Sequence, residues 1–189
     1  NNRYSVTGSI RMDQSNLFGT DPKYQYRPLW SVGASWFMAS EEFMSNVKWI
    51  NRLNLRLTYG INGNVSKESG PYLTVKDYGY NSWTGDFSAY IENPPNPQLR
   101  WEKTAVTNLG VDFSFFNSRL NGTVDYYIRK STDLLGNRET DPTLGWNSLL
   151  LNYGSLSNRG IEVSLSSKNI IKPNFEWGTN LNFSYNKNK

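Results

Sequence analysis

Apolar and polar residues alternate one for one along several stretches of this sequence. In the clearest stretch, Leu53, Leu55 and Leu57 are separated by Asn54 and Arg56. Successive side chains of a β-strand point to opposite faces, whereas a helix would scatter these leucines around its circumference. The pattern therefore predicts a strand with one apolar and one polar face. Seven stretches are predicted as strands on this basis: 4–13, 30–38, 53–62, 101–115, 120–129, 161–166 and 175–185.

The residue types that are missing exclude several chemistries. The 189 residues include no Cys and no His. Nucleophile pairs of the Ser-His-Asp or Cys-His kind, zinc sites with nitrogen and sulfur ligands, haem-binding histidines and disulfides are therefore excluded. Any catalysis would depend on carboxylates, Lys or Tyr. We expect no enzyme activity, no metal and no cofactor.

Charge and hydropathy narrow the class of protein further. Twenty Lys and Arg against sixteen Asp and Glu give a net charge of +4, but the basic residues are scattered singly, mostly beside acids. A nucleic-acid surface needs a clustered basic stripe, so no nucleic-acid partner is expected. The mean hydropathy of −0.64 argues against a transmembrane helix. Membrane-spanning β-strands are compatible with this value, because their alternating apolar and polar residues average to a polar mean hydropathy.

The connections between the predicted strands alternate in length. Long ones fall at 14–29, 63–99 and 131–159, and shorter ones at 39–49, 117–118 and 168–174. An up-and-down meander would place every long connection at one end, as in outer-membrane barrels. Within the shorter connections, Ser40 and the two acids after it predict a brief helix at 40–44, and Pro173 prevents a strand from continuing.

Strand length and aromatic placement favour a membrane barrel. Soluble sandwich strands average about 5–6 residues, whereas eleven tilted residues rise roughly 27 Å, enough for an apolar band of about 25 Å. We therefore predict an all-β, transmembrane, antiparallel up-and-down β-barrel; the alternative is a soluble β-sandwich that binds carbohydrate. About seven strands would leave open edges in hydrocarbon, so they are expected to belong to a larger barrel. The aromatic residues expected near strand ends on the apolar face are Trp30, Trp101, Phe113, Phe115, Phe175, Trp177, Phe183 and Tyr185.

Five segments resemble segments of SusC/RagA-type TonB-linked outer-membrane receptors and follow one another in the same order as in those receptors. The resemblance implies a 22-stranded barrel in the bacterial outer membrane, with an N-terminal plug and energy supplied through TonB. It also implies import of glycans or peptides, with a SusD-like surface lipoprotein as a lid. The segments are Tyr24 to Trp36 (YQYRPLWSVGASW) with Ser40 to Phe43, Leu53 to Asn64 (LNLRLTYGINGN), Asn96 to Leu135, Asn152 to Leu165 (NYGSLSNRGIEVSL) and Phe175 to Lys189 (FEWGTNLNFSYNKNK).

The resemblance also implies a place for this chain within such a receptor. Residues 1–189 match a middle portion of the barrel domain. No segment matches the plug, the box that contacts TonB, the signal peptide or the C-terminal strand, so these are expected to be absent from residues 1–189. None of their functional residues can be carried over.

Aromatic residues in the long connections are the candidate site. Rings flanked by hydrogen-bonding groups suit a sugar or peptide ligand, because the ring covers apolar C–H patches and the polar groups bind hydroxyls or amides. Alternatively, the same rings pack the loop against its neighbours or against the lid protein. The ligand-facing or lid-facing candidates are Tyr72, Tyr78, Tyr80, Trp83, Phe87 and Tyr90 in 63–99, and Trp146 in 131–159.

Two carboxylates form a second candidate group. Asp112 and Asp125 fall on the polar faces of two strands joined by a tight turn, so they are expected to lie near one another. Paired carboxylates catalyse glycoside hydrolysis. Charged walls of barrels also carry such residues as ion pairs, which is the interpretation we favour. Possible cationic partners are Arg11, Arg56, Arg119 and Arg129.

Overall fold

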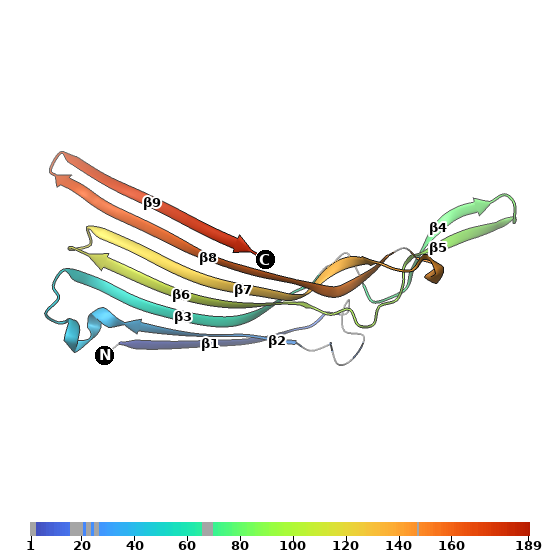
Figure 1. The fold of residues 1–189 in the computed structure, drawn as a ribbon, viewed down its shortest axis with the longest axis horizontal. Coiled ribbons are helices and arrows are strands. Elements are labelled where there is room, and N and C mark those ends of the chain that lie inside the picture. Colours follow the sequence, from blue (N-terminus) through green and yellow to red (C-terminus); the bar gives the residue numbers. More distant parts are fainter. Residues whose placement is uncertain (1–2, 16–20, 22–23, 25–26, 66–69, 147) are drawn as a thin grey trace.

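Most of the chain forms one antiparallel sheet in the computed structural model (Figure 1), which describes residues 3–15, 21, 24, 27–65, 70–146 and 148–189. Seven strands pair in the order β1-β2-β3-β6-β7-β8-β9. This order is a meander with one insertion, so the predicted up-and-down topology is confirmed. The strands are β1 (Tyr4–Asp13), β2 (Arg27–Phe37), β3 (Ile50–Asn64), β6 (Glu102–Phe115), β7 (Leu120–Glu139), β8 (Ser148–Lys172) and β9 (Phe175–Asn188).

The register across the sheet separates an apolar face from a polar face. Residues that pair directly share a face, because side chains alternate along every strand. One row joins Trp36, Leu55, Val111, Val124, Val163 and Phe183. The adjacent row joins Asn54, Asp112, Thr123, Ser164 and Asn182. The apolar and polar residues that alternate in the sequence therefore lie on opposite faces of the sheet.

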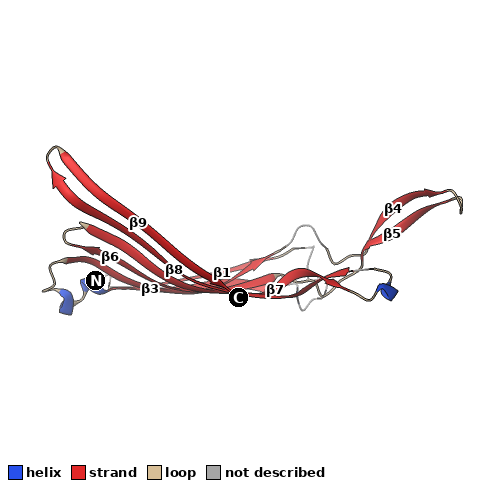
Figure 2. Cartoon of the chain, turned by 45° about the horizontal axis from the view of Figure 1, so that its top comes forward, coloured by secondary structure: helices blue, strands red, loops and turns tan. Residues whose placement is uncertain are grey.

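No second layer of described residues covers the apolar face. Figure 2 shows a single layer of strands, and Val6, Leu57 and Leu181 on this face are 76%, 51% and 53% exposed. A soluble sandwich would bury such side chains between two sheets about 10 Å apart. The soluble carbohydrate-binding alternative is therefore not supported.

Short connections lie at one end of the sheet and long connections at the other, as predicted (Figure 1). The turn after β6 has positive φ at Phe116, Asn117 and Ser118, which is a tight reversal. The brief helix expected at 40–44 is instead two 3-10 turns, η1 (Met38–Ser40) and η2 (Glu42–Met44), without a side-chain cap. Most of the first long connection lies outside the described residues.

Two predicted connections are largely strand. The 131–159 segment continues the pairing of β7 with β8 up to a short connection at 140–147, and the 168–174 segment continues β8 to Lys172. Asp133 has φ of +58° at a register shift between Ser131 and Leu134. Such a bulge inserts an extra residue and breaks the alternation, which explains why the pattern failed there. Pro173 does lie in the turn, as expected.

The 63–99 connection also contains regular structure. Within it, β4 (Thr74–Asn81) and β5 (Asp86–Asn93) form a separate two-stranded hairpin. A register shift between Asp77 and Gly79 interrupts its alternation.

Among the described residues, no helix has the length and apolar character needed to cross a membrane.

Candidate functional site

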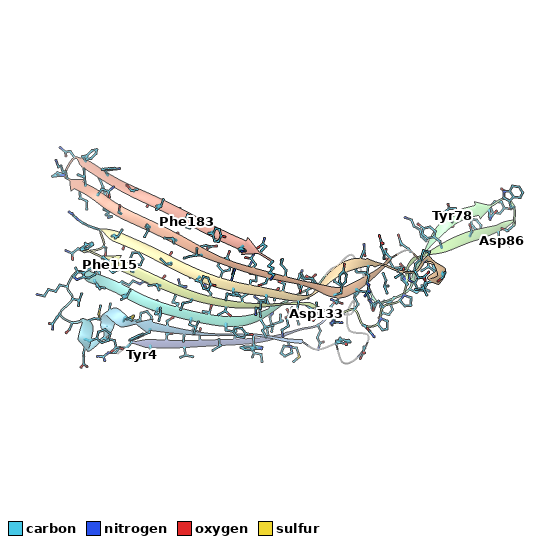
Figure 3. All side chains as sticks on the ribbon, in the orientation of Figure 1. Tyr4, Tyr78, Asp86, Phe115, Asp133 and Phe183 are labelled. Carbon is cyan, nitrogen blue, oxygen red and sulfur yellow. The ribbon has the colours of Figure 1, made fainter. Side chains whose placement is uncertain are left out.

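The β4–β5 hairpin carries most of the predicted site residues. It projects away from the sheet at the end with the long connections, and Figure 3 places Tyr78 and Asp86 on it, remote from Phe115 at the opposite end. Trp83 in its turn is 96% exposed, and Tyr78 and Phe87 are each 78% exposed. Tyr72, just before β4, is also exposed. The sequence did not predict the hairpin that presents these rings, and their contact with a ligand or a lid protein stays a prediction.

Two ring pairs bridge the strands of the hairpin. Tyr78 contacts Tyr90 edge-on with ring centroids 5.7 Å apart, and Tyr80 contacts Phe87 similarly at 5.8 Å. Such pairs contribute about 0.5–1.5 kcal/mol each beyond their buried area. These four rings therefore pack on one another within the hairpin; the predicted alternative, packing against neighbouring loops or the lid protein, stays open. Trp83 makes no ring contact among the described residues and remains available to a ligand or a protein.

The base of the hairpin is tied to the sheet. Asn96 follows β5; its backbone N–H donates to the carbonyl of Pro71 at 2.9 Å, and its side-chain amide donates to the carbonyl of Leu150 at 2.7 Å. Nearby, Leu99 and Trp101 are 1% and 9% exposed and form a small core. Trp101 was expected on the exposed apolar face, but it is buried just before β6 begins. This core fixes where the hairpin leaves the sheet.

Arg100, which directly follows the 63–99 connection, contacts residues of the other two long connections. Its Nη2 lies 2.6 Å from Asp133 Oδ1 at the β7 bulge, and its guanidinium lies over the ring of Tyr24, 5.3 Å from the centroid. Asn152 of β8 accepts from the Arg100 backbone N–H and donates to the Arg100 and Asp133 carbonyls at 2.7 Å. Sequence reasoning missed this cluster, because nothing in the sequence pairs polar residues from separate loops.

Trp146 lies apart from the hairpin rings. It belongs to the β7–β8 connection after the 3-10 turn η3 (Pro142–Leu144), and its carbonyl accepts from Thr140 Oγ1 at 2.7 Å. The side chain is half-buried, and its Nε1 is buried without a partner among the described residues. No described ring pair joins it to the hairpin. The structure therefore brings together the residues at 78–90 and leaves Trp146 separate.

The two predicted carboxylates share one guanidinium on the polar face. Arg56 donates from Nε and Nη2 to the two oxygens of Asp112 at 2.8 and 2.9 Å, and from Nη2 to Asp125 Oδ1 at 3.2 Å. Asn54 and Asn108 add hydrogen bonds to Asp112 and Asp125, respectively. Each carboxylate is thus the counter-ion of a fixed cation. This geometry supports the ion-paired wall and not a hydrolytic pair.

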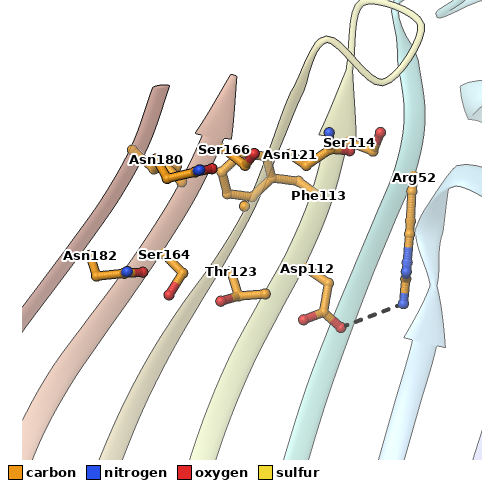
Figure 4. Close-up of a pocket in the computed structure, with 12 residues that line it drawn as sticks. Arg52, Asp112, Phe113, Ser114, Asn121, Thr123, Ser164, Ser166, Asn180 and Asn182 are labelled. Atoms are coloured by element: carbon orange, nitrogen blue, oxygen red, sulfur yellow. Dashed lines mark ion pairs between the residues drawn. The ribbon is translucent and has the colours of Figure 1, made fainter. Parts of the chain in front are cut away.

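A hollow of about 560 Å³, lined by polar side chains together with Phe113 and Leu165, adjoins this cluster (Figure 4). Two rows of small polar side chains line it, one through Asp112 and the other through Ser114. Arg52 reaches Asp112 Oδ2 at 4.0 Å across its rim. Ser, Thr and Asn groups in rows can bind water or the polar surface of a neighbouring segment. The other residues of these rows are Thr123, Ser164, Asn182, Asn121, Ser166 and Asn180.

Comparisons with known proteins agree with this architecture. A family model described as "TonB dependent receptor-like, beta-barrel" matches residues 1–189. The chain is 38% identical to TonB-dependent receptor P39 of Formosa agariphila, over 99% of the chain and 18% of that receptor. It is 33% identical to TonB-dependent receptor SusC of Bacteroides thetaiotaomicron, over 100% of the chain and 19% of that receptor.

Solved structures give the same result. The RagAB peptide importer matches with TM-scores of 0.85 in its closed-closed state and 0.86 in its open-open state. Sequence identity is 28% in both, over 99% of this chain and 20% of the matched chain. The chain thus spans about a fifth of the length of the relatives it matches.

Proposed function

This chain belongs to the TonB-dependent receptor-like β-barrel family, and from that premise we propose that it forms part of the wall of an outer-membrane nutrient importer. The proposed unit is residues 1–189 as one portion of a larger barrel domain. Its two outer strands, β1 and β9, support this, because an open edge in hydrocarbon leaves N–H and C=O groups without partners. Neighbouring strands of the full receptor would form hydrogen bonds with these backbone groups.

The uncovered apolar face is the observation that carries the proposal. On β9, alternate residues from Phe175 to Tyr185 point to this face and are exposed. Ten residue steps at about 3.3 Å, tilted about 40°, rise roughly 25 Å, which matches the apolar band of outer-membrane barrels. Phe175 and Trp177 lie at one end of this span and Phe183 and Tyr185 at the other. These positions suit two aromatic girdles, one at each membrane surface.

In the proposed orientation the long connections face the cell exterior. Outer-membrane barrels have short periplasmic turns and longer extracellular loops, and the described connections differ in the same way. The β4–β5 hairpin and its exposed rings then stand at the outer mouth. The polar face, with the cluster of Arg56, Asp112 and Asp125, lines the lumen.

The proposed cargo is a glycan or a peptide, captured with the help of a SusD-like surface lipoprotein. One structural relative is named as a peptide importer and one sequence relative as SusC. Exposed rings support either cargo, since they stack on the C–H faces of sugars and on peptide side chains. Trp83 is the residue we assign to contact with cargo or lipoprotein, because its side chain is 96% exposed and pairs with no other ring of the described residues. Tyr72, Tyr78, Tyr80, Phe87, Tyr90 and Trp146 are proposed to flank that contact surface.

Transport in this proposal requires energy delivered by the TonB complex through other parts of the receptor, and no bond-making chemistry. The carboxylates that a glycosidase would need are both tied to Arg56. The chain therefore acts as scaffold and mouth, not as an enzyme.

Uptake by cells that produce the full-length receptor tests this function. Cells receive a fluorescently labelled tryptic peptide digest or a labelled oligosaccharide panel, with and without a protonophore. The proposal predicts receptor-dependent accumulation from one of these pools that is lost when the proton-motive force collapses. Equal accumulation in cells that lack the receptor, or accumulation that persists with the protonophore, would contradict it.

A further inference from the structure

Five basic side chains gather on the apolar face of strands β6 to β9, toward the end with the long connections. Arg159 of β8 pairs directly with Lys187 of β9. In the next row outward, Lys130 of β7 pairs with Ser157, whose backbone is hydrogen-bonded to that of Lys189. Lys103 of β6 lies one row farther out on the same face, opposite Thr132. These residues are scattered in the sequence, and only the strand register brings them together. We call Lys103, Lys130, Arg159, Lys187 and Lys189 the basic belt.

The basic belt has no compensating negative charge. The positions that share this face on β6 to β9 include no Asp or Glu. None of the five residues forms an ion pair with a described acid. Like charges directly opposite each other on neighbouring strands destabilise a sheet. The direct Arg159–Lys187 pair is therefore unfavourable unless an anion lies against it.

Surface hollows accompany the basic belt. One of about 290 Å³ is lined by Ser157, Arg159, Lys187 and Lys189. A second, of about 310 Å³, places Arg159 and Lys187 beside the apolar side chains of Tyr126, Ile161 and Tyr185. The second hollow combines cations on one side with rings and aliphatic groups on the other. That combination suits a ligand with an anionic head and an apolar body.

The depth of the basic belt fits such a ligand. Along β9 the apolar positions end at Phe183 and Tyr185, and Lys187 is the next residue on that face. The outer aromatic girdle and the cations are therefore adjacent, at the level where lipid headgroups begin. The same rows on β2 and β3 carry Val32, Tyr59, Trp30 and Ile61 instead. The cations are thus confined to one sector of the wall.

We propose that the basic belt is a binding site for phosphorylated lipid headgroups of the outer leaflet, with Arg159 and Lys187 at its centre. This inference rests on the proposed membrane orientation. Each Lys or Arg near an anionic membrane surface strengthens binding by about fivefold. The phosphate-bearing lipid would neutralise the facing cations while its acyl chains lie along Tyr185 and Ile161. A lipid is favoured over a protein or nucleic acid because the cations continue the lipid-facing surface without a break.

Titration of the purified full-length receptor with diphosphorylated lipid A in neutral detergent tests the site. Enzymatically dephosphorylated lipid A, with the same acyl chains, is the matched ligand. Removing both central cations with Arg159→Gln and Lys187→Gln should weaken binding of the phosphorylated lipid about 25-fold. Arg129→Gln is the matched control, because Arg129 lies near Tyr127 on the polar face, and it should change the affinity less than twofold.

The conservative exchange of Arg159→Lys with Lys187→Arg should retain the affinity, which keeps the test valid if the neutral variant folds poorly. Equal binding of the two lipids by the natural receptor would overturn the inference, as would unchanged affinity in the neutral variant. Energy-dependent uptake is measured in parallel. Equal binding of the two lipids by a natural receptor that shows energy-dependent uptake rejects the lipid site alone, whereas absence of energy-dependent uptake rejects the proposed function.

Discussion

Arg56 reaches Asp125 across a strand position that has no side chain. Nη2 of Arg56 lies 3.2 Å from Asp125 Oδ1, and Gly110 occupies the position between the two residues in the register. A Cβ atom at Gly110 would lie 2.5 Å from Asp125 Oδ1 and 2.7 Å from Arg56 Nη2. Glycine at this position therefore allows one guanidinium to serve two carboxylates on different strands.

Gly110→Ala should displace the Arg56–Asp125 pair while leaving the pairing of Arg56 with Asp112. The expected loss is about 1 kcal/mol of unfolding free energy, the scale of one partly exposed ion pair. Denaturant unfolding of the full-length receptor in detergent measures it. Gly8→Ala is the control, because its Cβ would meet only Ser31 O at 3.9 Å. In an Asp125→Ala background the Gly110→Ala loss should shrink, and an undiminished loss would reject this account.

Arg substitutions on adjacent residues of β8 test which face meets lipid. Leu165 pairs with Gly122 and Leu181 on the apolar face, and Ser166 pairs with Asn121 and Asn180 on the polar face. Leu165→Arg should cost about 2–4 kcal/mol near the bilayer midplane, whereas Ser166→Arg should cost little. Unfolding in lipid vesicles measures both. Similar losses for the two variants would mean that the assignment of faces is wrong.

The pH dependence of stability should depend on Glu41. Its carboxylate accepts from Tyr4 Oη at 2.6 Å and from Trp36 Nε1 at 3.0 Å, and these hydrogen bonds hold its pKa below the ordinary value of 4.5. A lowered pKa stabilises the fold above the unfolded pKa, and the contribution is lost as the pH falls through the folded pKa. Glu41→Gln should therefore be less stable than the natural protein near neutral pH, with the difference shrinking on acidification.

Unfolding midpoints of both proteins between about pH 7 and pH 3 measure this difference. Glu42→Gln is the control, because the Glu42 carboxylate is 89% exposed and, among the described residues, pairs only with Arg3, at 3.2 Å. A difference for Glu41→Gln that stays constant down to the lowest pH would contradict the assigned role.

Trp83→Ala should weaken binding without changing the stability of the fold. Because the ring is 96% exposed, its removal should change the unfolding free energy by less than about 0.5 kcal/mol. Uptake or lipoprotein binding by the full-length receptor should fall. Phe87→Ala, which breaks the ring pair with Tyr80, should additionally loosen the hairpin and increase its proteolysis. Unchanged uptake and unchanged lipoprotein binding with Trp83→Ala would remove this residue from the contact surface.

The sheet was predictable because apolar and polar residues alternate along its strands, and the strand register keeps each kind on its own face. Leu53, Leu55 and Leu57 repeat at the period of a strand, and every partner across the register follows the same rule. The sequence also showed that the aromatic candidates at 78–90 lie in one long polar connection, and their role in binding stays a prediction.

The remaining features depend on register and on long-range pairing. Asp133 adopts a left-handed conformation at a bulge, so the strands around it lost their alternation in the sequence and were assigned to a loop. Arg100, Asp133 and Asn152 come from segments that fold toward one another only once β6, β7 and β8 are paired. The basic belt was hidden for the same reason, because Arg159 and Lys187 are neighbours only across a strand pair.

Single-cysteine labelling of intact cells tests the membrane-barrel account most directly, because it asks which end of the sheet faces outward. Ser82 lies in the turn of the β4–β5 hairpin, and Ser118 lies in the tight turn between β6 and β7 at the opposite end. Residues 1–189 contain no Cys, and the unsubstituted full-length receptor, labelled in parallel, measures any background from the rest of the receptor. With a membrane-impermeant maleimide, the account predicts labelling of Ser82→Cys, with Ser118→Cys labelled only after the cells are opened. Labelling of Ser118→Cys in intact cells, with Ser82→Cys protected, would contradict it.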